Sequence, residues 1–238
     1  HFTNVRVPRE NLLDRYGSVD ENGVYSSPIE SRGRRFFTIL GTLVQGRVSL
    51  VGAASVASQL AMTIAVKYAV VRRQFPVPGT DTEQVLMDYQ QHQRRLLPRL
   101  ANAYAMVFAQ DELLASFHDV FSGARDTEEE RQDLETLAAA LKPYATWSAL
   151  DIIQAARESC GGQGYLAENR LSTLHGDMDV YATFEGDNTV LLQLVAKRLL
   201  GDYAKQFKGA DFGTMAGYLA DQVGDAAFNR SGLRRLAQ

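Results

Sequence analysis

A single carboxylate, Glu185, stands between an aromatic residue and a glycine, just before a run of apolar residues at helical spacing. Asn188 is a favourable helix N-cap, so Glu185 is expected on the loop that leads into this helix. A carboxylate held there could act as a base on a carbon acid, provided that the loop is buried and a cofactor lies opposite. The alternative is that Glu185 only complements the positive end of the helix dipole.

Arg72 and Phe75 close the first long helical stretch, in the sequence Arg-Arg-Gln-Phe. An arginine at a helix C-terminus often does no more than complement the dipole. Its guanidinium fork also matches two phosphate oxygens, which allows a second interpretation of Arg72 as a phosphate ligand.

Three glycines, Gly161, Gly162 and Gly164, follow another helical stretch within four positions. A helix C-cap followed by a tight turn explains the first of them. The others suggest that something approaches the backbone closely, such as the flat face of a nucleotide. The dinucleotide-binding fingerprint needs a strand before the glycines and a helix after them, so a Rossmann domain is not predicted.

No metal site is predicted, because the four histidines are far apart and share no ligand spacing. The one cysteine, Cys160, excludes an internal disulfide, fits a reducing compartment and is expected to be packed rather than nucleophilic.

Composition describes an ordinary globular chain of 238 residues, 45% hydrophobic and 22% charged. Its net charge of −3 gives no electrostatic reason to expect nucleic acid or an anionic membrane as a partner. The first residues carry no signal peptide, and the longest apolar runs are interrupted by charge or glycine. The expectation is an intracellular protein without an integral membrane segment.

The pattern predicts an all-α fold, an antiparallel four-helix bundle, preceded by a remnant strand at Phe2–Pro8. That strand is expected to be the last one of a β-domain, and residues 15–34 are expected to form a loop. Helices are predicted at 36–72, from a Thr80/Glu83 capping box to about 122, from the acidic turn at 126–131 to the glycine cluster, and behind Glu185. Pro98 predicts a kink in the second helix, and a short fifth helix is predicted at about 211–223.

Five motifs in series resemble the acyl-CoA dehydrogenase and acyl-CoA oxidase superfamily from residue 2 to about 207. They are Phe2-Thr-Asn-Val-Arg-Val-Pro-Arg-Glu-Asn-Leu-Leu13, Gly46-Arg47, Tyr68-x3-Arg72-x-Gln-Phe75, Cys160-Gly-Gly-Gln-Gly-Tyr165 and Phe184-Glu-Gly-Asp-Asn-Thr-Val190. Two further stretches, Met87–Tyr104 and Leu141–Trp147, and the sequence Glu185-Gly-Asp-Asn188 resemble the oxidase branch in particular.

The resemblance implies that Glu185 removes the α-proton of a fatty acyl-CoA while the β-hydride passes to FAD, giving the trans-2-enoyl-CoA. It implies that the Glu185 amide and Gly186 contact the substrate, and that Asp187 and Asn188 lie against the cofactor. In the oxidase branch oxygen reoxidises the flavin and yields hydrogen peroxide.

The resemblance also implies a homodimer or higher homo-oligomer that shares FAD across its interface. Arg72 would bind the FAD pyrophosphate and Phe75 would pack on the cofactor, both across that interface, with the three glycines against the partner's FAD.

Some positions depart from the family pattern. Glu158 replaces a glutamine of many dehydrogenases, Pro76 replaces the usual glycine, and Gly46 stands where some relatives carry the base. The expected domains are 1–34, the end of a β-domain and a linker; 35–207, the helical bundle; and 208–238, the start of a linker or second helical domain. A chain without the remaining domains is expected to bind FAD poorly and to be inactive alone.

Two other functions stay open at this stage. One is a dehydrogenase that passes electrons to a flavoprotein acceptor, and the other is a non-catalytic helical interaction module. The expected location is cytoplasmic, or peroxisomal in a eukaryote.

Overall fold

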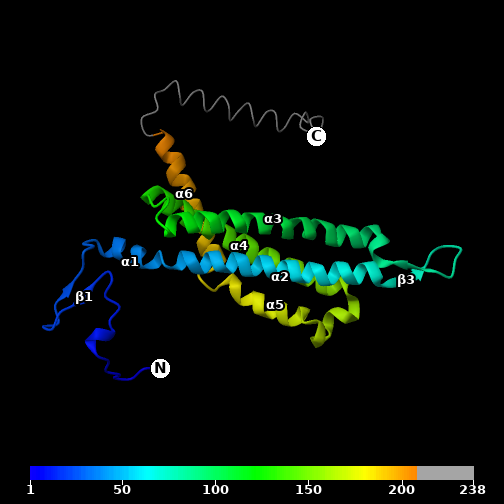
Figure 1. The fold of residues 1–238 in the computed structure, drawn as a ribbon, viewed down its shortest axis with the longest axis horizontal. Helices are drawn as coiled ribbons and strands as arrows, with labels where there is room; N and C mark the ends of the chain where they lie inside the picture. The colour runs from blue at the N-terminus through cyan, green and yellow to red at the C-terminus, as the bar shows by residue number, and fades with distance from the viewer. Residues whose placement is uncertain (208–238) are drawn as a thin grey trace. The chain divides into compact units, whose positions relative to one another are not determined.

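The computed structural model describes residues 1–207, apart from the side chains at positions 34, 37, 40, 206 and 207 (Figure 1). The predicted helix at about 211–223 lies outside the described residues. Residues 1–192 form one compact unit, and a second unit begins at Gln193, within helix α6 (Asn188–Phe207). The first unit is mostly helical, which confirms the all-α prediction.

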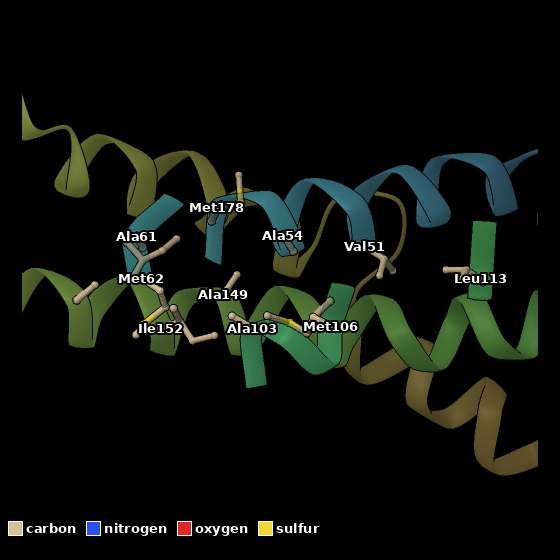
Figure 2. Close-up of a cluster of buried hydrophobic side chains, with 14 of the residues drawn as sticks. Val51, Ala54, Ala61, Met62, Ala103, Met106, Leu113, Ala149, Ile152 and Met178 are labelled. Carbon is tan, nitrogen blue, oxygen red and sulfur yellow. The ribbon is translucent and has the colours of Figure 1, made fainter. Parts of the chain in front are cut away.

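Three long helices, α2 (Leu43–Val71), α3 (Gln90–Phe121) and α4 (Glu128–Ser159), pack together with the shorter α5 (Leu171–Asp179). Small residues of α2 lie fully buried at helical spacing, among them Ala54, Ala61 and Ala65. Because these side chains are short, α3 and α4 approach the α2 backbone closely, and larger side chains such as Met106 and Ile152 fill the space between them (Figure 2).

Helix α2 is long and apolar enough to span a membrane by composition alone, and it is the one such helix among the described residues. More than half of its most apolar stretch is buried inside the bundle, so its central place in the core accounts for this composition.

The direction of the long helices follows from their side-chain contacts. Gly52, early in α2, lies against Gln110, late in α3, so these two helices are antiparallel. Arg99, early in α3, makes a two-pronged ion pair with Asp151, late in α4, at 2.8 and 2.9 Å. Helices α2 and α4 therefore run in the same direction, and their C-terminal ends lie at the same end of the bundle.

The predicted helix at 36–72 is two helices, α1 (Arg32–Leu40) and α2. At the junction the amides of Gly41 and Thr42 bond to carbonyls three residues back, at 3.3 and 3.4 Å. The glycine favours this tighter turn because it is a poor helix former.

The prediction that Thr80 and Glu83 form a capping box at the start of the second helix is wrong. A hairpin, β3 (Arg73–Pro76) and β4 (Glu83–Val85), occupies this region, and α3 begins only at Gln90. Prolines and Gly79, at φ +81°, form the turn of the hairpin. Pairing with β3 then places Glu83 of the predicted cap in strand β4. Pro98 lies inside α3, which continues past it, and the predicted kink stays a prediction.

The structure assigns no strand at Phe2–Pro8, so the prediction that this segment is the last strand of a β-domain stays a prediction. These residues are exposed and pair with no strand of the described chain, and an isolated strand leaves its backbone groups unsatisfied. The predicted loop at 15–34 instead contains a short hairpin, β1 (Ser18–Val19) and β2 (Tyr25–Ser26), after the 3₁₀ turn η1 (Arg9–Asn11). Asp20 stabilises its turn by accepting bonds from two backbone amides at 2.9 and 2.8 Å.

The acidic start of α4 matches the prediction, with a capping box between Thr127 and Glu130. The sequence did not predict α5 or the short 3₁₀ turns, which are η2 (Leu86–Asp88) before α3, and η3 (Gly161–Tyr165), η4 (Ala167–Asn169) and η5 (Val180–Ala182) on either side of α5. They are too short to show a periodic pattern.

Candidate active site

Glu185 lies on the tight loop between η5 and α6, as predicted. Its φ is +57°, in the left-handed region, and Gly186 follows at φ +110°. A positive φ is uncommon for a residue with a side chain and costs free energy, so the surrounding structure must hold the loop in place.

The Glu185 carboxyl group packs directly over Gly46 near the start of α2. A Cβ at position 46 would lie 2.5 Å from Glu185 Cδ, so only glycine leaves room for the carboxylate here. Glu185 Oε2 is buried and has no hydrogen-bond partner. Buried polar atoms are nearly always paired, so an unpaired carboxylate oxygen is a candidate proton acceptor.

Arg47, buried beside Gly46, anchors the same loop. Its Nε donates to the Glu185 backbone carbonyl at 3.3 Å, and its Nη1 lies 3.9 Å from Glu135 Oε1. Burial lowers the pKa of Arg47, and the nearby Glu135 and Glu185 carboxylates oppose this shift. The motif Gly46-Arg47 was noted in the sequence, but nothing in its pattern showed that both residues contact the Glu185 loop.

Lys142 of α4 reaches the loop from the other side and was not singled out by sequence reasoning. Its side chain is fully buried, and its Nζ donates to the Gly186 carbonyl at 2.7 Å and to Asn188 Oδ1 at 2.8 Å. A signal for it exists in hindsight: Lys142 falls at helical spacing with the buried residues Ala138 and Ala145 of α4.

Asn188 does not cap α6 as predicted. The helix begins at Asn188, whose buried side chain is committed to Lys142 and to Thr146, to which Nδ2 donates at 3.0 Å. Asp187 takes the capping role: its Oδ1 accepts from the amides of Thr189 and Val190, at 2.9 and 3.3 Å. Both side chains therefore stabilise the loop, and their predicted contacts with a cofactor stay predictions.

Arg72 and Phe75 lie at the other end of α2. Arg72 ends the helix with an exposed side chain, and Phe75 sits on a bulge of β3 at φ +61°, with 65% of its surface exposed. Bulges often redirect a side chain next to a functional site. A cavity of about 290 Å³ adjoins Phe75, lined also by Tyr89, His92 and Arg95.

The glycine cluster lies at this same end, in η3 after α4. Gly161 has φ +55°, and neither Gly161 nor Gly162 has another group within reach of an added Cβ. This open space fits the approach of a planar cofactor. Position 164 requires glycine for a different reason. Gly164 is buried, and a Cβ added there would lie 1.9 Å from the Arg157 carbonyl oxygen.

This difference gives a paired test of the two glycines. We expect Gly164→Ala to destabilise the protein by about 1–3 kcal/mol, because the clash is with backbone that cannot move aside cheaply. Gly162→Ala should leave the unfolding free energy nearly unchanged, because the added methyl group meets nothing within 4 Å. Urea unfolding of both variants measures the difference, and equal stability would contradict it.

The predicted site residues thus form two groups rather than one. Glu185 and Gly186 lie beside Gly46, whereas Arg72, Phe75 and the glycine cluster lie one helix length away. At 1.5 Å per residue, the 26 residues from Gly46 to Arg72 span about 39 Å. One flavin cofactor cannot touch both groups of a single chain. Within the described residues no three potential metal ligands gather, so no metal centre is seen there.

Comparisons with known proteins agree with these motifs. The family model of the acyl-CoA oxidase C-alpha1 domain matches residues 40–200. An acyl-coenzyme A oxidase-like protein of Mus musculus is 43% identical over 87% of this chain and 32% of its own length. Peroxisomal acyl-coenzyme A oxidase 2 of Arabidopsis thaliana is 40% identical over 93% of the chain and 32% of its own length.

Solved structures show the same relationship. Acyl-CoA oxidase 1 of Arabidopsis thaliana superposes with a TM-score of 0.78 at 34% identity, covering 88% of this chain and 31% of that one. Acyl-CoA oxidase-1 of Caenorhabditis elegans, solved with FAD and ATP, gives 0.73 at 30% identity, covering 85% and 29%.

The chain spans about a third of the length of the curated relatives it matches. The family model covers well over half of the chain, and its matched region contains both groups of site residues. The chain therefore belongs to the acyl-CoA oxidase family.

Proposed function

We propose that this chain supplies the catalytic base and part of the cofactor site of an FAD-dependent acyl-CoA oxidase. The reaction converts a fatty acyl-CoA to the trans-2-enoyl-CoA, the first step of fatty acid β-oxidation, and passes two electrons to oxygen to give hydrogen peroxide. The observation that carries this proposal is the buried, unpaired Glu185 Oε2 above Gly46.

In this proposal Glu185 accepts the proton from the carbon next to the thioester. The Glu185 backbone amide donates to the thioester carbonyl and stabilises the charge that develops on its oxygen. The buried guanidinium of Arg47 adds positive charge next to the loop and holds its backbone through the Glu185 carbonyl. FAD, when bound, supplies the two-electron oxidation of the neighbouring carbon.

FAD is the proposed cofactor, and the chain fits it at the far end of the bundle. Arg72 is an exposed residue whose guanidinium would bind the pyrophosphate, Phe75 presents an exposed ring, and Gly161 and Gly162 leave open space for a flat group. The two relatives from Caenorhabditis elegans whose structures contain FAD support this assignment.

The proposed assembly is a homodimer or higher homo-oligomer. Glu185 packs over Gly46, which lies about 39 Å along α2 from Arg72. Each flavin would therefore contact the base of one protomer and the Arg72 end of its partner. Domain boundaries at 34/35 and 207/208 are part of the proposal. The proposed compartment is the peroxisome where the organism has one, as the names of the Arabidopsis and human relatives state for those proteins.

The test uses a full-length protein containing this chain, loaded with FAD and given straight-chain acyl-CoA in air without an added electron acceptor. We expect enoyl-CoA and hydrogen peroxide in equal amounts. Bleaching of the flavin without peroxide would identify a dehydrogenase instead. If the flavin stays oxidised with every chain length, the proposed function is wrong.

A further inference from the structure

Lys142 is a fully buried cation placed directly behind the Glu185 loop. Its ammonium group has three hydrogens, and three oxygens lie around it: the Gly186 carbonyl at 2.7 Å, Asn188 Oδ1 at 2.8 Å and the Ala182 carbonyl at 3.5 Å. These acceptors bracket Glu185 on both sides in the sequence. One side chain of α4 thus connects the beginning and the end of the loop.

A second layer of hydrogen bonds fixes Lys142 and its partner in place. Asn188 Nδ2 donates to Thr146 Oγ1 at 3.0 Å, and Thr146 Oγ1 donates to the Lys142 carbonyl at 2.9 Å. Lys142, Thr146 and Asn188 are each at most 1% exposed. Because Lys142 Nζ, Asn188 Nδ2 and Thr146 Oγ1 each donate to a partner within the protein, the network is rigid rather than adaptable.

We propose that Lys142 is a positioning residue for Glu185, which holds the strained loop so that the carboxylate stays over Gly46 with Oε2 free. This inference rests on the proposed function of Glu185 as the base. Lys142 touches neither substrate nor cofactor in this proposal, and it acts through the carbonyls of the loop.

The energetics of the loop require such a support. Glu185 at φ +57° is held in a conformation that costs on the order of 1–3 kcal/mol, and the contacts around it must offset that cost. Arg47 makes one bond to the loop, at 3.3 Å, whereas Lys142 makes bonds of 2.7 and 2.8 Å there. The shorter bonds from a fully buried ammonium identify Lys142 as the stronger of the two supports.

The charge of Lys142 makes this support sensitive to pH. Burial lowers its pKa to about 8, with opposing contributions from the Asp187 and Glu185 carboxylates and a further lowering from Arg47. Above that pH the amine keeps only two hydrogens and loses its attraction to the carboxylates. We therefore expect kcat to fall as the pH rises through about 8.

Stability should change in the opposite direction. The unfolded chain holds the Lys142 proton up to a pH near 10.5, the folded chain only up to about 8. The unfolded state therefore binds more protons between these values, and the free energy of unfolding rises with pH across this window. A purely structural lysine would show this rise without any loss of kcat.

The experiment compares wild type, Lys142→Met, Lys142→Arg and the control Lys67→Met in a full-length, FAD-loaded protein containing this chain. Lys67 is exposed on α2, far from the loop. We expect Lys142→Met to lower kcat roughly 10- to 100-fold with KM changed less than about threefold, as is usual for groups that orient a site residue from behind. Lys67→Met should behave as wild type.

Lys142→Arg should recover part of kcat and lose the alkaline fall near pH 8, because a guanidinium stays charged there. Urea unfolding of wild type and Lys142→Met at pH 7 to 10.5 gives a readout independent of turnover. The difference in unfolding free energy between the two proteins should change with pH. If Lys142→Met does not fold, the dependence of wild-type kcat on pH tests the proposal instead. A kcat that stays constant up to pH 10 would overturn it.

The two proposals fail in different ways. A wild-type protein that oxidises no acyl-CoA would overturn the proposed function and the role of Lys142 with it. Wild-type turnover together with unchanged kcat in a folded Lys142→Met variant would overturn the positioning role alone.

Discussion

Glu185→Gln, in a full-length protein containing this chain, is expected to lower kcat for the proposed acyl-CoA oxidation by about 10²- to 10⁴-fold, the usual contribution of a general base. Glutamine has nearly the same shape as glutamate but cannot accept the proton. The Arg47 and Lys142 contacts go to backbone carbonyls of the loop and to Asn188, so the substitution should leave them in place. The fold and the binding of acyl-CoA should be kept.

The measurement is the rate of flavin reduction in a single turnover, which isolates the proton-transfer half of the reaction from reoxidation by oxygen. Glu135→Gln is a suitable control, because it makes the same change of side chain at a second carboxylate near Arg47, 3.9 Å from its Nη1. A Glu185→Gln variant that reduces flavin at the wild-type rate would exclude Glu185 as the base.

Gly46→Ala is expected to lower kcat by about 10²-fold while leaving the protein as stable as before or more so. The new Cβ would lie 2.5 to 2.8 Å from the Glu185 carboxyl atoms, so the carboxylate must move. Displacing a reacting group by about 1 Å can cost this much in rate. The clash is with the end of a flexible side chain, and alanine favours the helix over glycine by about 1 kcal/mol, so the fold does not suffer.

Gly52→Ala is the matched control, since Gly52 lies in the same helix and faces Gln110 rather than Glu185. Thermal unfolding and kcat measured on both variants should show a gain or no change in stability for each, and a loss of activity for Gly46→Ala alone. Full activity in Gly46→Ala would mean that the carboxylate does not need the space above Gly46.

The parts of the molecule that the sequence predicted well are those with long periodic patterns. The stripe of α2 and the acidic cap of α4 depend on contacts within one helix, and both were found. The prediction failed where contacts between segments distant in the sequence determine the local structure. The Thr80/Glu83 pattern was a valid local cap, but pairing of β3 with β4 placed it in a hairpin.

The candidate site shows the same division. The position of Glu185 on a loop before a helix was predictable, because Gly186 and the following apolar run are its immediate neighbours. Asn188 was assigned to the cap because it is a good capping residue, yet Lys142, 46 residues earlier, binds its side chain and leaves the cap to Asp187. No spacing rule connects residues on α4 with a loop beyond α5.

The separation of the two groups of site residues along α2 has a genetic consequence in the proposed dimer. Each flavin site would draw its base from one chain and its arginine from the other. A chain damaged at Glu185 and a chain damaged at Arg72 would then restore one intact site when they pair, although neither is active with itself. Two such alleles would complement each other in a cell that carries both, whereas two lesions at the same end of the helix would not.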